Sequence, residues 1–225
     1  MPDHTAKAYD ADLEELTRGV AEMGGLAEKL IADSVDALVK RDGARAQRVI
    51  AADEAIDTLQ HTIEEKAILT IARRQPMAVD LRMLVSTLKI SNDLERVGDH
   101  AVNIAQCARR LAEALPISMP SELERMADVA TGMLRDSIEA FIERDVTLAR
   151  EVLVRDDEVD RYNDVVFRLM LREMSENTNK LTSGLQLMLV SRNLERIADL
   201  ATNIAEDVVF LVEGRTIKHG AELPD

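Results

Sequence analysis

The sequence predicts an all-helical protein built as two tandem three-helix bundles. Ala, Leu, Glu, Arg and Met are abundant, aromatic residues make up only 2% of the chain and Trp is absent, so the composition favours helices that pack without bulky rings. Apolar residues recur at the spacing of one helix face. In addition, one long stretch occurs twice: DLERVGDHAVNIAQ at 93–106 returns as NLERIADLATNIAE at 193–206.

The repeat extends upstream of these stretches and covers most of the 225 residues. DSVDALVKRD at 33–42 matches DSIEAFIERD at 136–145, and ADEAID at 52–57 matches RDDEVD at 155–160. Self-similarity on this scale indicates a duplicated structural unit, which arises from an internal duplication.

Helix-start and helix-stop signals divide each copy into three helices. They comprise N-cap candidates, a capping box, a first-turn proline and a C-terminal glycine: Asp42 and Asp145, Ser121 with Glu124, Pro76, and Gly214. The expected helices lie near 8–40, 44–74, 76–114, 121–143, 146–175 and 178–213. Short connections between long helices make neighbours antiparallel, so we expect bundles over 1–116 and 117–225.

Charge and cysteine content exclude several classes of protein. The formal net charge of -14 opposes a phosphate backbone, so nucleic acid is not an expected partner, whereas cations or basic partner surfaces are. Cys107 is the only cysteine, so no intrachain disulfide can form. The first residues lack the apolar core of a signal peptide, and no run approaches the roughly 20 apolar residues that span a bilayer. We expect a cytoplasmic protein.

Acidic pairs at helical spacing are the main functional signal. On the third helix, Glu95 and Asp99 lie opposite the apolar face, and on the second helix Asp53 and Asp57 form another pair at i and i+4. Asp53 and Asp99 are equally far from Pro76 along the chain, and so are Asp57 and Glu95. An antiparallel hairpin turning there places all four carboxylates at matching heights.

The second copy repeats this arrangement. Asp156 and Asp160 pair with Glu195 and Asp199 about the junction of Glu176 and Asn177. Clustered carboxylates repel one another unless cations lie between them, and oxygen ligands favour Mg²⁺, Ca²⁺ or Mn²⁺, with iron also compatible. We therefore predict two metal sites. His61 and His100 have no counterparts in the second copy, so they are at most outer ligands, and the roles of Arg96 and Arg196 stay open.

An apolar strip lies beside the carboxylates of the third helix, outside the expected core. Such a strip is either covered by another part of the chain or forms an interface, and we expect a homodimer or a partner-docking surface. Its residues are Leu81, Leu84, Val85 and Leu88 in the first copy and Leu181, Leu185 and Met188 in the second.

With these motifs in hand, the chain resembles the PhoU family of phosphate-responsive regulators. The resemblance runs through RRQPMAVDLR at 73–82, SNDLERVGDHAVNIA at 91–105, NLERIADLATNIAED at 193–207 and VEGRTIKH at 212–219. It implies PhoU-like tandem bundles that bind metal on their surfaces through the eight acidic residues above, with Mg, Mn, Fe or Zn as the cofactor. Ala198 stands where the first copy has Gly98, which implies that the second site differs.

The resemblance also implies a function and partners. It suggests a cytoplasmic adaptor that represses the phosphate-starvation response when phosphate is plentiful. Such a protein would act between the ATPase subunit of a phosphate ABC transporter and a phosphate sensor histidine kinase, and would reach the membrane only through these partners. It would not be an enzyme.

Two other classes compete with this interpretation. A metal-dependent phosphohydrolase would use a metal-activated water, but no nucleophile, Gly-rich phosphate loop or repeated His base accompanies the acidic residues. A di-iron oxidase or iron-storage bundle with no phosphate role needs Glu-x-x-His pairs pointing into a four-helix core, and the sequence has none.

Overall fold

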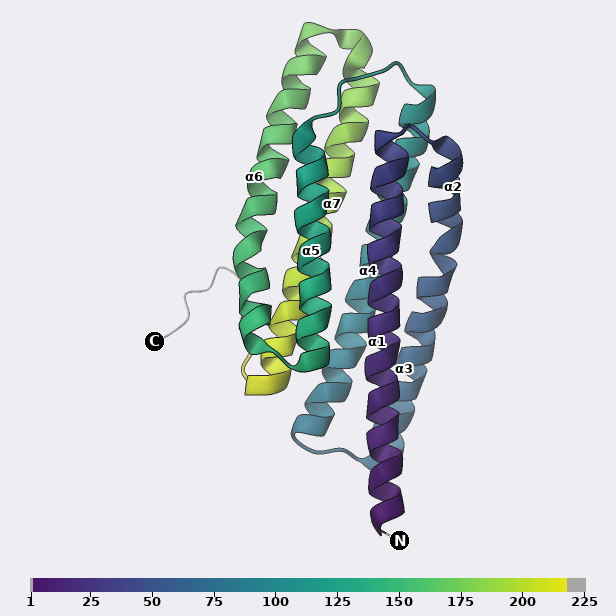
Figure 1. Ribbon diagram of the computed structural model, residues 1–225, viewed down its shortest axis with the longest axis vertical. Coiled ribbons are helices and arrows are strands. Elements are labelled where there is room, and N and C mark those ends of the chain that lie inside the picture. Colours follow the sequence, from purple (N-terminus) through teal and green to yellow (C-terminus); the bar gives the residue numbers. More distant parts are fainter. Residues whose placement is uncertain (1, 218–225) are drawn as a thin grey trace.

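The computed structural model describes residues 2–217, and within that part every regular element is a helix (Figure 1). The predicted all-helical fold of two tandem three-helix bundles is confirmed. The last two residues of the VEGRTIKH motif and the end of the predicted second bundle lie outside the described residues. The elements are α1 Pro2–Val39, α2 Gly43–Ala52, α3 Glu54–Arg74, α4 Val79–Glu113, α5 Ser121–Glu143, α6 Val146–Glu176, the 3₁₀ turn η1 Thr178–Lys180, and α7 Leu181–Glu213.

Three of the predicted helix-end signals are confirmed. The Asp42 carboxylate accepts from the Arg45 backbone N–H, and Asp145 accepts from two N–H groups of the first turn of α6. Gly214 ends α7 with a left-handed φ of 70° and donates its N–H to the carbonyl of Phe210.

Two signals were misread. Pro76 does not start a helix, because α4 begins only at Val79, after Ala78 with a φ of 50°. Pro120 is the N-cap of α5, and no capping box forms, since the Ser121 hydroxyl bonds the neighbouring Glu122 carboxylate instead.

The second predicted helix is broken in two. Asp53 separates α2 from α3, whereas the corresponding stretch of the second copy is the continuous helix α6. The break lies at a predicted metal ligand, because Asp53 is both the C-cap of α2 and the N-cap of α3. No Pro or Gly marks it in the sequence.

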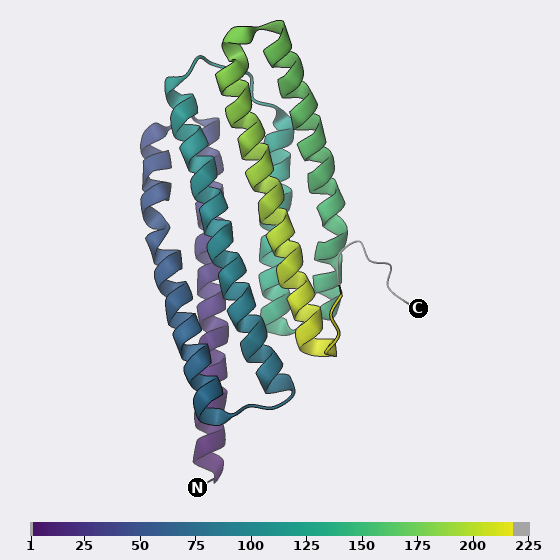
Figure 2. The ribbon, with the colours of Figure 1, turned by 180° about the vertical axis from the view of Figure 1, so that it is seen from behind.

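The two bundles stand side by side, and their corresponding helix connections lie at opposite ends of the molecule. The α3–α4 connection lies at one end of the molecule and the α6–α7 connection at the other (Figure 1). Seen from behind, α3, α4, α7 and α6 follow one another across one face, with α1 and α5 behind them (Figure 2). Buried apolar side chains from both copies form one continuous cluster, with Met23, Ile90, Met126 and Phe141 among the largest.

Helices α4 and α7 run antiparallel along a shared seam. Arg82 donates to the Leu211 carbonyl at 3.1 Å, and Arg110, more than two dozen residues further along α4, donates to the Gln186 side chain at 3.3 Å. Between these ends, Lys89 pairs with Asp207 at 2.7 Å. These contacts along the seam therefore fix how far one copy is shifted along the helix axes relative to the other.

The seam corrects part of the predicted docking surface. Leu84 is fully buried and Leu88 packs against the core, while Arg82 and Ser86 on either side of Leu84 bond to α7. The strip on α4 is therefore largely covered within the chain. At the start of α4, Leu81 is exposed; on α7, Leu181 and Leu185 are exposed while Met188 packs against the core. The open apolar strip therefore lies mainly on the second copy.

Candidate metal centre

The first acidic quartet, Asp53, Asp57, Glu95 and Asp99, is brought together by the α3–α4 hairpin. The core face of α4 is buried, including Leu94 and Val97 on either side of Glu95, which turns the carboxylates away from the core as predicted. The proximity shows in the pKa of Asp53, which is raised to about 6 by burial first and then by the charges of Asp57, Asp99 and Glu95.

One oxygen of this quartet is buried without a partner. Oδ1 of Asp53 is inaccessible to solvent and accepts no hydrogen bond. It lies against the backbone of α4 at Gly98, where a β-carbon would be only 2.7 Å away. A glycine is thus what allows the carboxylate to approach the helix this closely.

The first quartet carries uncompensated negative charge. Among the side chains that the structure describes, none of these four carboxylates forms an ion pair of 4.0 Å or less, although such contacts occur elsewhere on the molecule. Burial and then the charges of Asp99 and Asp57 raise the pKa of Glu95, and the nearby Arg96 opposes this rise. Asp53 and Glu95 are partly buried, and Asp57 and Asp99 are exposed. Clustered carboxylates without a paired cation favour a metal ion between them.

The side chains do not yet converge on a single point. Among the described residues, no three Asp, Glu, His or Cys side chains form a group that could hold a metal ion as they stand. Asp53 nevertheless fits a metal site, because its buried oxygen has no hydrogen-bond partner and is available to a cation. Binding would require the other carboxylates to turn inward, and metal binding remains a prediction.

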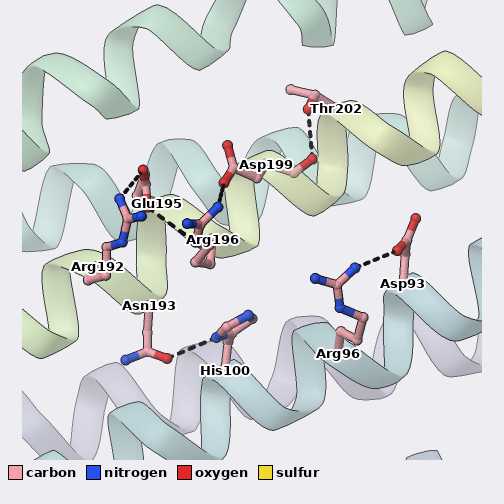
Figure 3. A network of polar contacts seen from close by, with 9 residues as sticks. All are labelled: Asp93, Arg96, His100, Arg192, Asn193, Glu195, Arg196, Asp199 and Thr202. Carbon is pink, nitrogen blue, oxygen red and sulfur yellow. Dashed lines mark hydrogen bonds and ion pairs between the residues drawn. The ribbon is translucent and has the colours of Figure 1, made fainter. Parts of the chain in front are cut away.

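The second acidic quartet, Asp156, Asp160, Glu195 and Asp199, has a different environment. Arg192 donates to Glu195, and Arg196 donates to Asp199 at 2.8 Å while its Nε lies 3.9 Å from Oε2 of Glu195 (Figure 3). The pKa of Glu195 is still raised, by burial first and by Asp199, with both arginines opposing the rise. Two guanidinium groups therefore form ion pairs with the carboxylates of α7.

The α6 members of the second quartet differ in burial. Asp156 is buried, with 7% of its surface exposed, and lines a cavity of about 430 Å³ together with Arg96, Arg196 and Asp199. Asp160 is exposed and contributes to the raised pKa of Glu195. The structure thus brings acidic residues of α6 and α7 near one another, with arginines among them.

Neither histidine is placed as a ligand. His100 reaches across the seam to Asn193, whose carbonyl oxygen accepts from Nδ1 at 2.9 Å (Figure 3). Asn193 in turn donates to the Leu189 carbonyl on its own helix. His61 is exposed on α3. His100 therefore contributes to the joint between the two copies.

The arginines whose roles were open have separate partners. Arg96 pairs with Asp93 on its own helix at 3.4 Å, while Arg196 pairs with Asp199 of the second quartet (Figure 3). Arg192 was overlooked in the sequence. Its signal was available, because the first copy has Asn92 at the matching position.

Sequence comparisons point to one family. The PhoU domain matches the chain twice, over residues 20–108 and 123–208. A phosphate-specific transport system accessory protein PhoU homolog of Caulobacter vibrioides (strain NA1000) is 45% identical over 218 residues, which are 96% of this chain and 95% of that protein. A homolog of the same name from Rhizobium meliloti (strain 1021) is 41% identical over 212 residues, 94% of this chain and 90% of that protein.

Solved structures give the same result. The crystal structure of PhoU from Pseudomonas aeruginosa superposes with a TM-score of 0.88 at 35% identity, covering 92% of this chain and all of that one. The phosphate transport system regulatory protein PhoU from Streptococcus pneumoniae gives a TM-score of 0.87 at 28% identity, covering 93% and 99%. The similarity therefore extends over both copies of the repeat.

Proposed function

The chain belongs to the PhoU family, and we propose that it is a metal-binding accessory regulator of phosphate uptake that represses the phosphate-starvation response when phosphate is plentiful. The observation that carries this proposal is the near full-length similarity to proteins named as accessory or regulatory components of phosphate transport. Such names describe a protein that acts on others, which supports an adaptor without enzymatic activity.

The proposed partners are the ATPase subunit of a phosphate ABC transporter and a phosphate sensor histidine kinase, both met at the cytoplasmic side of the membrane. No helix in residues 2–217 is long and apolar enough to cross a bilayer. The open apolar strip of α7, with Leu181 and Leu185, supports docking of a partner or of a second copy in a homodimer. Sedimentation of the purified protein with and without Leu185→Arg distinguishes the homodimer from a monomer.

The metal part of the proposal rests on the first quartet. Asp53, Asp57, Glu95 and Asp99 would hold a divalent or iron ion, with Mg, Mn, Fe and Zn as candidates. The ion would supply positive charge at a place where the chain supplies only carboxylates. Its proposed role is to hold α3 and α4 together and to present a defined charge to a partner.

The regulatory role is tested by deleting the gene and following a phosphate-starvation reporter in high-phosphate medium. The proposal expects reporter activity to rise on deletion and to fall again when the wild-type gene is restored. An unchanged reporter would contradict a repressing role.

Metal binding is tested separately by elemental analysis of the purified protein. The comparison is a variant in which Asp53, Asp57 and Asp99 become Asn and Glu95 becomes Gln. The proposal expects less metal in this variant, and equal metal in both proteins would refute it. Circular dichroism checks that the variant keeps its helices.

A further inference from the structure

The two acidic quartets occupy equivalent places in the repeat, yet their surroundings differ in kind. We propose that only the first quartet is an open cation site, and that Arg192 and Arg196 act as built-in counter-ions that keep metal out of the second. This inference rests on the proposed metal-binding role and assigns that role to one copy of the repeat.

The arginines of α7 are positioned to compete with a metal ion. Arg192 lies one helical turn before Glu195, Arg196 lies one turn before Asp199, and both arginines are within 4.0 Å of Glu195. The Glu195 side chain is only 13% exposed, so its charge is poorly screened by water. A cation entering here must displace at least one guanidinium or share its carboxylates with it.

A difference at one position of the repeat explains why the first quartet lacks such a counter-ion. Arg192 corresponds to Asn92, which carries no charge. The first quartet therefore has nothing one turn before Glu95 that could pair with it.

A second difference explains the behaviour of the remaining arginine. Arg96 and Arg196 correspond in the repeat, but Arg96 has Asp93 one turn earlier on its own helix and pairs with it at 3.4 Å. The second copy has Asn193 there, which is bonded to His100 and to its own helix and offers no charge. Without that alternative, Arg196 turns to Asp199 and Glu195.

A third difference changes the room beside the helix. At Gly98 the Asp53 carboxylate lies where a β-carbon would be, and its Oδ1 has no partner. The second copy has Ala198, which is completely buried, so its methyl group fills the corresponding place. The close approach of a carboxylate to the helix at Gly98 therefore has no counterpart at Ala198. The second quartet also has a buried oxygen without a hydrogen bond, Oε2 of Glu195, but that oxygen lies 3.9 Å from Nε of Arg196.

The charges give the expected size of the effect. The first quartet offers four carboxylates with no paired cation, whereas two arginines form ion pairs with Glu195 and Asp199 of the second. Each guanidinium a few ångströms away repels a divalent ion, and water weakens this repulsion without removing it. We expect the second quartet to bind at least about tenfold more weakly than the first.

The test is a titration of the metal-free full-length protein with Mn²⁺, with free Mn²⁺ followed by electron paramagnetic resonance. Glu95→Gln with Asp99→Asn should remove the tight binding, and Glu195→Gln with Asp199→Asn should leave it intact. Arg192→Asn with Arg196→Gln should add a second class of sites, at least about tenfold tighter than wild type shows there. The matched change in the first copy, Asn92→Arg, should weaken tight binding by a similar factor.

Each result decides between the proposals. If the two carboxylate-neutralised variants each lose half of the tight binding, the quartets are equal and the inference is wrong while metal binding stands. If Arg192→Asn with Arg196→Gln gains no site although Glu95→Gln with Asp99→Asn loses one, the arginines do not exclude metal. If no protein in the series binds Mn²⁺, both proposals fall. Both arginine side chains are about half exposed, so their replacement should spare the fold, which circular dichroism verifies.

Discussion

Oδ1 of Asp53 lies 2.7 Å from the place where a β-carbon of Gly98 would be, and it accepts no hydrogen bond. This contact joins the break between α2 and α3 to the middle of α4. It also makes Gly98 the residue on which the shape of the first quartet depends.

Replacing Gly98 with Ala should weaken Mn²⁺ binding while changing stability little. Ala gains about 1 kcal/mol of helix propensity over Gly, and moving the Asp53 carboxylate away from its place offsets that gain. Urea unfolding and Mn²⁺ titration measure the two effects. Gly25→Ala in α1 is the control, because nothing lies within 4 Å of its added β-carbon. An increase in stability equal to that of Gly25→Ala, with unchanged Mn²⁺ binding, would mean that the close contact is unimportant.

Asp53→Asn should stabilise the metal-free protein at neutral pH. The folded-state pKa of Asp53 is raised to about 6, so its favourable contribution is present below the ordinary carboxyl pKa and is lost as pH rises towards 6. The variant should therefore be more stable at pH 7.5 by on the order of 1 kcal/mol, after allowing for solvent screening, and little changed at pH 4. Chelator-treated protein unfolded in urea at both pH values provides the measurement. A loss of stability at pH 7.5 would contradict the assignment.

Leu84→Ala should destabilise the protein by about 2–5 kcal/mol, because it opens a cavity in the seam between α4 and α7. Leu185→Ala is the matched control on the exposed strip of α7 and should cost no more than about 0.5 kcal/mol. Urea midpoints of the two variants give the comparison. Equal costs would show that the seam does not depend on Leu84.

Lys89→Met should destabilise the protein more at pH 8 than at pH 5. Burial raises the pKa of Asp207, and the hydrogen bond from Lys89 opposes that rise. Without the amine, the pKa of Asp207 rises further, and a carboxylate charged at pH 8 is left buried at a cost of about 1–3 kcal/mol. The methionine keeps an apolar stem near the Phe210 ring. Asp207→Asn in the same background should remove the pH dependence, and a cost independent of pH would refute this account.

Much of the fold follows from local sequence signals. The duplicated motifs predict two like bundles, and the N-cap aspartates Asp42 and Asp145 predict where their second helices begin, because a cap depends only on neighbouring residues. The break at Asp53 has no such signal, since the related helix α6 runs on unbroken with an aspartate at the same place.

The seam could not be derived in the same way. The apolar strip on α4 predicts that something covers Leu84, but periodicity in one helix does not say whether the cover is α7 or another molecule. In the candidate site, the hairpin geometry predicts which carboxylates come together. The arginine pairing depends on side-chain rotamers, although the difference between Asn92 and Arg192 is visible when the two copies are compared.

The α4–α7 seam also has the geometry of an isologous contact. His100 and Asn193 face each other across it, and their counterparts in the opposite copies are Leu200 and Asp93. Related helices that meet antiparallel are what a twofold axis between two identical subunits would produce. The chain thus has the form of a symmetric dimer fused into one polypeptide, and fusion freed each half to diverge. A subunit of a true dimer could not hold Asn92 on one side of the axis and Arg192 on the other.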